Sequence, residues 1–155
     1  KHILKLNLLF SFLLVFLAGN TFAQDDPLIG KWKVLAVDNG EFYFNSELDS
    51  VFLTDELKIR YSEPSKIENL KKMARMLYID QTFTFTEDNQ LIIKNIMQPL
   101  TSFYKKDSQS PRLFVYESEV QQDSPDFLIN YHFQDSRLFI EMTVTDPPIK
   151  FELTR

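Results

Sequence analysis

The chain has 155 residues, of which 22 are acidic and 17 are Lys or Arg, so its formal net charge is −5. An acidic surface repels phosphate backbones, and no basic patch interleaved with aromatic residues offsets this, so nucleic acid is excluded as an expected partner. Cysteine is absent, which excludes disulfides, thiol catalysis and thiolate metal sites. An apolar core must therefore stabilise the fold, and the 15 Phe of the chain supply ample area for it.

Residues 1–23 have the three parts of a secretory signal peptide. Lys1 and Lys5 lie in a basic start, residues 6–17 form an apolar run, and Ala23 occupies a small-residue position before the expected cut. The run is too short for a spanning helix, which needs about 20 apolar residues, so we expect no stable membrane anchor. Cleavage after Ala23 would leave residues 24–155 as one periplasmic or secreted domain, more acidic than the whole chain.

The first predicted strand covers residues 31–38, where alternation places Trp32, Val34 and Ala36 on one face. Asn39 and Gly40 follow at once, and this pair is the strongest short hairpin signal because both residues tolerate a positive φ. Residues 41–45 are the expected return strand.

Residues 46–78 interrupt the β pattern. Ser65 and Glu68 have the spacing of a capping box, and Pro64 before them is compatible with a helix start. Apolar residues then recur at helical spacing, which predicts one amphipathic helix over residues 65–77. Residues 48–61 fit either a second helix or an irregular strand.

From residue 81 the period returns to two, with Phe83 and Phe85 between threonines and a second strand over residues 91–96. A three-residue loop with a left-handed Asn89 pairs Phe83 with Ile93, whereas a shorter loop would set Phe83 against Lys94. The register that keeps apolar residues together is favoured. Residues 99–111 are predicted to be a polar connection, with a short strand at 103–104.

The rest of the chain reads as further strands over residues 113–120, 127–133, 138–145 and 149–154. A hairpin around residues 135–136 puts six apolar side chains on one face. The pairs are Ile129 with Met142, Tyr131 with Ile140, and Phe133 with Leu138. The sequence therefore predicts an all-β fold, an antiparallel eight-stranded up-and-down barrel with one inserted amphipathic helix.

A resemblance to a known group of proteins begins directly after the signal, in the segment Leu28-Ile29-Gly30-Lys31-Trp32-Lys33. Together with the insertion and the later hairpins, it resembles the lipocalin-like domains that many bacteria export, within the wider group of lipocalins and fatty-acid-binding proteins. In that group the tryptophan packs across the closed end of the barrel, often under an arginine from the last strand. The resemblance implies structural roles for Gly30, Trp32 and Arg155.

Catalytic chemistry finds no support in the sequence. It contains no G-x-S-x-G or H-E-x-x-H motif and no Gly-rich phosphate loop, so we expect no enzyme activity, catalytic residue or cofactor. His132 shares a strand face with Asn130, and pairing brings Glu141 beside them. One histidine without a second nitrogen or sulfur ligand makes a poor transition-metal site, so we expect a solvated outer face and no metal.

An eight-stranded barrel either fills its interior with side chains or holds one small ligand. The first hypothesis is a small, lipid-like apolar ligand in the barrel, bound by Phe83, Phe85, Tyr131, Phe133, Met142 and Phe151. The alternative is an envelope or secreted interaction module with a filled barrel, which presents loops or a sheet edge to a protein partner. A cavity of at least ~300 Å³ inside the barrel would favour the first hypothesis, and a packed interior would favour the second.

Overall fold

The structure is a computed structural model that describes residues 26–119 and 124–155. The expected signal peptide and its cleavage after Ala23 lie outside these residues. Within the described ranges, no helix is both long and apolar enough to cross a membrane.

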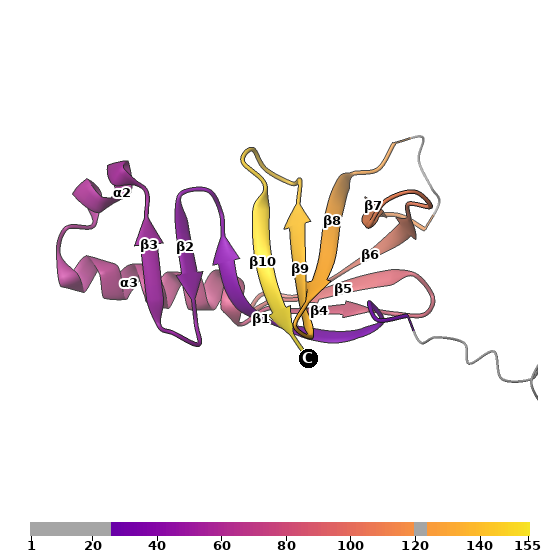
Figure 1. Ribbon diagram of the computed structural model, residues 1–155, viewed down its shortest axis with the longest axis horizontal. Helices are drawn as coiled ribbons and strands as arrows, with labels where there is room; N and C mark the ends of the chain where they lie inside the picture. The colour runs from indigo at the N-terminus through magenta and orange to yellow at the C-terminus, as the bar shows by residue number, and fades with distance from the viewer. Residues whose placement is uncertain (1–25, 120–123) are drawn as a thin grey trace, which may run out of the picture.

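Eight antiparallel strands follow one another around a closed barrel (Figure 1). The barrel closes where the first strand pairs with the last, β1 with β10. The eight strands are β1 (Gly30–Asp38), β4 (Thr82–Phe85), β5 (Gln90–Lys94), β6 (Pro99–Lys106), β7 (Arg112–Tyr116), β8 (Phe127–Gln134), β9 (Arg137–Met142) and β10 (Ile149–Thr154). The predicted fold class, an antiparallel eight-stranded barrel with an inserted helix, is confirmed.

Strand β1 pairs with β10 along one edge and with two different strands along the other. Residues 30–33 pair with β4, whereas residues 36–38 pair with β2 (Phe42–Asn45). Between the two stretches the register with β10 shifts, and the carbonyl of Leu35 accepts bonds from the backbone N and Oγ of Ser46, at 2.9 and 2.7 Å. The extra residue inverts the alternation, so Val37 faces the core and Ala36 faces outward. The expectation that Ala36 shares a face with Trp32 is therefore wrong.

The insertion between β2 and β4 holds a strand as well as helices. Strand β3 (Ser50–Leu53) pairs with β2 and extends the sheet beyond the barrel, and α2 (Asp55–Arg60) follows it. Residues 48–61 thus contain both of the alternatives that the sequence left open. The predicted helix is observed as α3 (Pro64–Ala74), which continues into the π-helical segment η1 (Arg75–Ile79).

Helix α3 begins at Pro64, which occupies the first helical turn. The N-cap residue is Glu63, and no side chain caps the helix, so the predicted capping box is wrong. A proline suits this position because its missing N–H would have no partner in the first turn anyway. The start of α3 therefore depends on backbone preference and not on a hydroxyl cap.

The helix packs against the inner face of the β2–β3 hairpin, behind these strands in Figure 1. Leu70 and Ala74 join the core, and the ring of Tyr78 lies 6.2 Å from that of Phe42 and 6.3 Å from that of Phe151. On the surface, Asp49 in the β2–β3 turn binds Lys71 and Arg75 of the helix, at 3.0 and 2.8 Å; these bonds lower the pKa of the Asp49 carboxyl. The core contacts therefore fasten the insertion to the barrel, and the ion pairs of Asp49 join its turn to its helical part.

The later hairpins have the registers that the apolar pattern predicts. Phe83 pairs with Ile93 around a left-handed Asn89, and Ile129, Tyr131 and Phe133 pair with Met142, Ile140 and Leu138. Strand β6 differs, because it runs from Pro99 to Lys106, whereas a polar connection was predicted. Its inward position 102 holds a buried serine, so the apolar alternation that marks a strand is absent there.

Side chains fill the interior of the barrel as one continuous core cluster. The Phe83 ring lies 5.3 Å from Phe151, and the Phe85 ring lies 5.7 Å from Tyr104, both at the tilted angles that aromatic pairs prefer. The largest completely buried side chains are Trp32, Phe44, Phe83 and Phe85.

The β1–β2 turn depends on a glycine that contacts the β9–β10 loop. Gly40 has φ +84°, and a Cβ added to it would lie 2.2 Å from Cγ of Pro147. We expect Gly40→Ala to lower the free energy of unfolding by about 1–3 kcal/mol, because the new methyl group is both strained and overpacked. Urea melts would measure this, with the exposed neighbour variant Glu41→Ala as the control. Equal stability of the two variants would contradict the prediction.

Candidate functional site: a groove on the outer face of the barrel

The six residues predicted to bind an apolar ligand lie on the inner face of the sheet. Phe83, Phe85, Met142 and Phe151 are buried in the core, and Tyr131 is half-buried beside them. Phe133 lies at the rim, 38% exposed, with its ring 6.0 Å from that of Trp32. The residues are therefore brought together, but they pack against one another and their neighbours.

Trp32 and Arg155 lie together at one end of the barrel. The indole is 2% exposed, its Nε1 donates to the carbonyl of Leu28 at 2.9 Å, and the Arg155 guanidinium lies 4.9 Å from the ring centroid. Arg155 also donates to the carbonyls of Pro27 and Ile29, at 2.9 and 3.2 Å. Gly30 lies beneath this arginine, with φ +135°. This is the arrangement that the resemblance implies, and it fastens the segment before β1 to the last strand.

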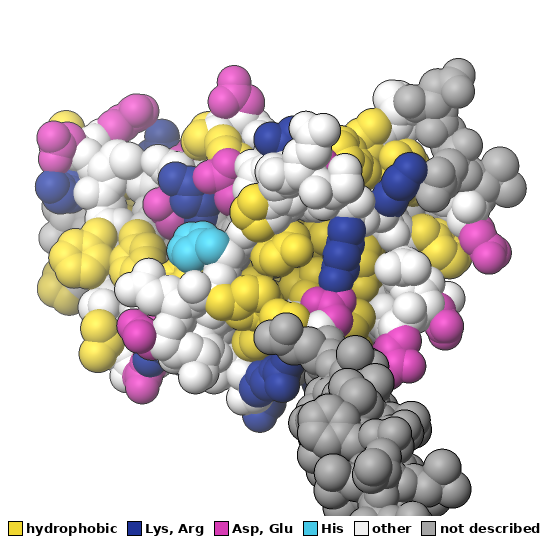
Figure 2. All heavy atoms as spheres, turned by 45° about the vertical axis from the view of Figure 1, so that its right-hand side comes forward, with side chains coloured by type: hydrophobic (Ala, Val, Ile, Leu, Met, Phe, Trp, Pro, Cys, Tyr) yellow, Lys and Arg dark blue, Asp and Glu magenta, His cyan; other side chains and the backbone are white. Residues whose placement is uncertain are grey.

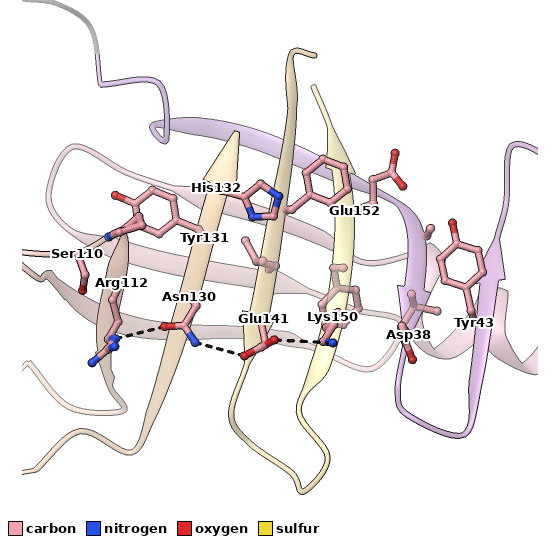
Figure 3. A pocket seen from close by; sticks show the side chains of 16 residues that line it. Asp38, Tyr43, Ser110, Arg112, Asn130, Tyr131, His132, Glu141, Lys150 and Glu152 are labelled. Atoms are coloured by element: carbon pink, nitrogen blue, oxygen red, sulfur yellow. Dashed lines mark hydrogen bonds and ion pairs between the residues drawn. The ribbon is translucent and has the colours of Figure 1, made fainter. Parts of the chain in front are cut away.

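A groove of about 580 Å³ crosses the outer face of the sheet from β7 to β2 (Figure 3). Its walls are outward-pointing side chains of β7, β8, β9, β10, β1 and β2, which lie in two rows across the strands. Figure 2 shows this face, where hydrophobic side chains lie next to the histidine and charged side chains of both signs lie close by. Core residues such as Ile140 and Phe151 also line the groove, since they belong to the same strands.

The first row is a chain of polar side chains, each linked to the next (Figure 3). Arg112 Nε donates to Asn130 Oδ1 at 3.2 Å, Asn130 Nδ2 donates to Glu141 Oε1 at 3.3 Å, and Lys150 Nζ lies 4.0 Å from Glu141 Oε2. Asp38 follows on β1, where it pairs with Lys150 in the ladder. Because each group restrains its neighbour, the row presents fixed donors and acceptors to the groove.

The second row begins with two stacked rings. His132 and Phe139 are cross-strand partners whose ring centroids lie 4.9 Å apart at an angle of 7°. Glu152 follows on β10, and it accepts a hydrogen bond from Arg137 that raises the pKa of this guanidinium. Ala36 is next, on β1. The bulge in β1 places this small side chain between Glu152 and Asn45, where it is only 1% exposed.

The β2–β3 hairpin supplies the far wall. Tyr43 of β2 lines the groove, and its ring lies 6.0 Å from that of Phe52 on β3. Since the hairpin extends the sheet beyond β1, the outer face is wider than the barrel alone would make it. The insertion therefore shapes this site, although it does not cover it.

Part of this site could be read from the sequence. The prediction that Asn130, His132 and Glu141 share one outer face agrees with the register of β8 and β9. Asp38, Lys150 and Tyr43 were missed, because they join this face only when the barrel closes and β10 lies beside β1. The alternation of each strand already marks them as outward-facing, but it says nothing about which strands are neighbours.

The groove is lined by charged groups of both signs, a side-chain amide and aromatic rings. Two cationic side chains, Arg112 and Lys150, lie among three carboxylates, Asp38, Glu141 and Glu152, so neither sign dominates. Within the described ranges there is no group of three or more His, Asp or Glu side chains that could hold a metal ion. The arrangement offers donors, acceptors and aromatic faces to a ligand without strong charge.

The comparisons with known proteins support the fold only. No protein-family model matches the chain, and no curated protein matches it. Among solved structures, it is similar to the crystal structure of a DUF4847 family protein from Bacteroides vulgatus ATCC 8482, with a TM-score of 0.51. The identity is 11%, and the match covers 82% of this chain and 92% of the other. At this identity the likeness concerns the barrel fold and carries no information about the site.

Proposed function

We propose that this domain is a non-catalytic binding module that holds its ligand in the outer-face groove and not inside the barrel. The observation that carries the proposal is the contrast between a core filled with rings and a hollow of about 580 Å³ on the opposite face of the same strands. Residues 1–23 further suggest that the module acts after export. The mass of the chain recovered from outside the cytoplasm would test this.

The interior is the weaker candidate because a ligand there would have to displace packed side chains. Phe83 is 0% exposed and Phe85 is 1% exposed, and each ring contacts another aromatic ring. On the α3 side of the barrel, Leu70, Ala74 and the ring of Tyr78 pack into the core and occupy the space that an entering ligand would need. Binding inside would therefore cost the packing energy that stabilises the fold.

The outer groove has the properties that ligand sites share. Its volume lies within the usual range of about 300–1,000 Å³, and it combines aromatic surface with a few fixed polar groups. The polar row is held by hydrogen bonds between its own members, at 3.2 and 3.3 Å, so little side-chain entropy is lost when a ligand binds. The aromatic wall at His132 and Phe139 is likewise fixed by stacking.

A fragment screen followed by amide chemical shifts in ¹H–¹⁵N spectra would test the location. We expect binding fragments to shift the amides of Asn130, Glu141 and Lys150, which belong to three adjacent strands of the groove. The Phe139→Ala variant should abolish these shifts. Hits that move the amides of Phe83 and Phe85 instead, or a screen without hits in the groove, would contradict the proposal.

A further inference from the structure

We propose that the ligand of this groove is a neutral glycan chain, bound between two aromatic walls; this inference rests on the proposed function. The walls are Phe139 on β9 and Tyr43 on β2, and the strands between them are β10 and β1. Neighbouring strands lie about 4.8 Å apart, so the two walls are separated by about 14 Å at the backbone.

A second ring supports each of these two rings, and the one that supports Phe139, His132, also lines the groove. His132 stacks on Phe139 at 4.9 Å, and Phe52 lies 6.0 Å from Tyr43. Phe139 and Tyr43 both line the groove and are partly exposed, with β10 and β1 between their strands. A sugar ring has an apolar face of C–H groups that packs against such a surface, while its hydroxyl groups point to the sides.

The floor between the walls is polar in the first row, where Lys150 and Asp38 offer a donor and an acceptor. In the second row the side chain of Ala36 is small and covered by its neighbours, with 1% of it exposed. Every sugar hydroxyl is both a donor and an acceptor, which matches a surface where both kinds alternate. An acyl chain would leave these polar groups without partners, and such groups are costly to desolvate.

The balance of charge favours a neutral chain over an acidic one. The three carboxylates of the groove slightly outnumber its two cations, so a polyanion gains no net attraction. Most of the lining side chains belong to the outer face of the sheet, outside the filled barrel, so the barrel wall does not limit the length of a bound chain. A chain of neutral sugars therefore fits better than a compact, charged metabolite.

Affinity electrophoresis of the exported chain would test this, in gels that contain soluble starch, dextran, xylan, galactomannan or mixed-linkage β-glucan. We expect at least one of these polysaccharides to retard the protein. Tyr43→Ala and Phe139→Ala should each weaken the retardation about tenfold, because each removes one wall. Phe114→Ala, an aromatic position of β7 that does not line the groove, is the matched control and should behave as the unmodified chain.

Thermal melts of every variant separate lost binding from lost folding. Migration unchanged by all five polysaccharides, or retardation that survives both wall substitutions, would overturn the glycan proposal. Retardation by polygalacturonate alone, abolished in Arg112→Gln, would overturn it in favour of an acidic glycan. If fragments still bind the groove in the amide-shift experiment, the proposed function stands while this inference fails; if neither binds, both fail.

Discussion

Replacing Trp32 by alanine is expected to lower the free energy of unfolding by about 3–5 kcal/mol, because a fully packed ring leaves a cavity that its neighbours cannot fill. The indole is 2% exposed, donates to the carbonyl of Leu28 at 2.9 Å and supports the ring of Phe133 at 6.0 Å. Denaturant melts followed by circular dichroism would measure the loss, since the variant has no tryptophan fluorescence.

Arg155→Ala separates the contribution of the arginine to stability from that of the indole. It keeps the indole but removes the guanidinium from its position 4.9 Å from the ring, together with the bonds to Pro27 and Ile29. A cation–π contact at an exposed site contributes about 0.5–1 kcal/mol, so the arginine variant should lose much less stability than Trp32→Ala. A loss below about 1 kcal/mol for Trp32→Ala would contradict the structural role of the indole.

Neither variant should affect the groove. Trp32 lies at the Arg155 end of the barrel and is separated from Asn130 and Lys150, which belong to the outer face. If Trp32→Ala abolished ligand binding while the protein remained folded, the site would have to lie at that end instead. The pair of variants therefore tests the division of the barrel into a structural end and a recognition face.

The strands that were predictable from the sequence are those in which burial and alternation agree. In β8 and β9, Ile129, Tyr131 and Ile140 face the core, so only one register keeps apolar residues paired. Strand β6 lacked this signal because Ser102 occupies one of its two buried positions. The bulge in β1 was hidden for another reason. Four apolar residues in succession, Val34 to Val37, satisfy either alternation, and the choice is visible only in the pairing with β10 and in the bonds from Ser46 to Leu35.

The groove was less predictable because it depends on which strands are neighbours. Lys150 and Asp38 are far apart in the chain, and they become partners only through the closure of β1 on β10. Tyr43 lies on β2, the return strand that Asn39 and Gly40 predict, but the sequence gives no sign that β2 and β3 leave the barrel while β4 takes the place beside β1. The polarity of an outer face can be read from one strand at a time, but a concave site on it requires the three-dimensional order of several.

Phe83→Ala is expected to cost about 3–5 kcal/mol and to open an apolar cavity inside the barrel. The ring is 0% exposed and lies 5.3 Å from that of Phe151. Phe139→Ala, on the outer face, should cost less, about 0.5–1.5 kcal/mol for its stacking on His132. Denaturant melts of the two variants would measure this difference.

The same pair of variants separates the two places where a ligand could bind. We expect a fluorescent fatty acid not to bind the unmodified protein and to bind Phe83→Ala, because the natural ring occupies the space that the acyl chain needs. An empty apolar cavity of this kind stays dry and accepts apolar molecules. Tight binding of the fatty acid to the unmodified chain that is weakened in Phe83→Ala would contradict the proposal of an outer-face site. It would mean that the ligand binds inside the barrel. Gain of fatty-acid binding in Phe83→Ala would therefore show that the natural ring fills the interior, whereas loss of binding in this variant would assign the ligand to the interior.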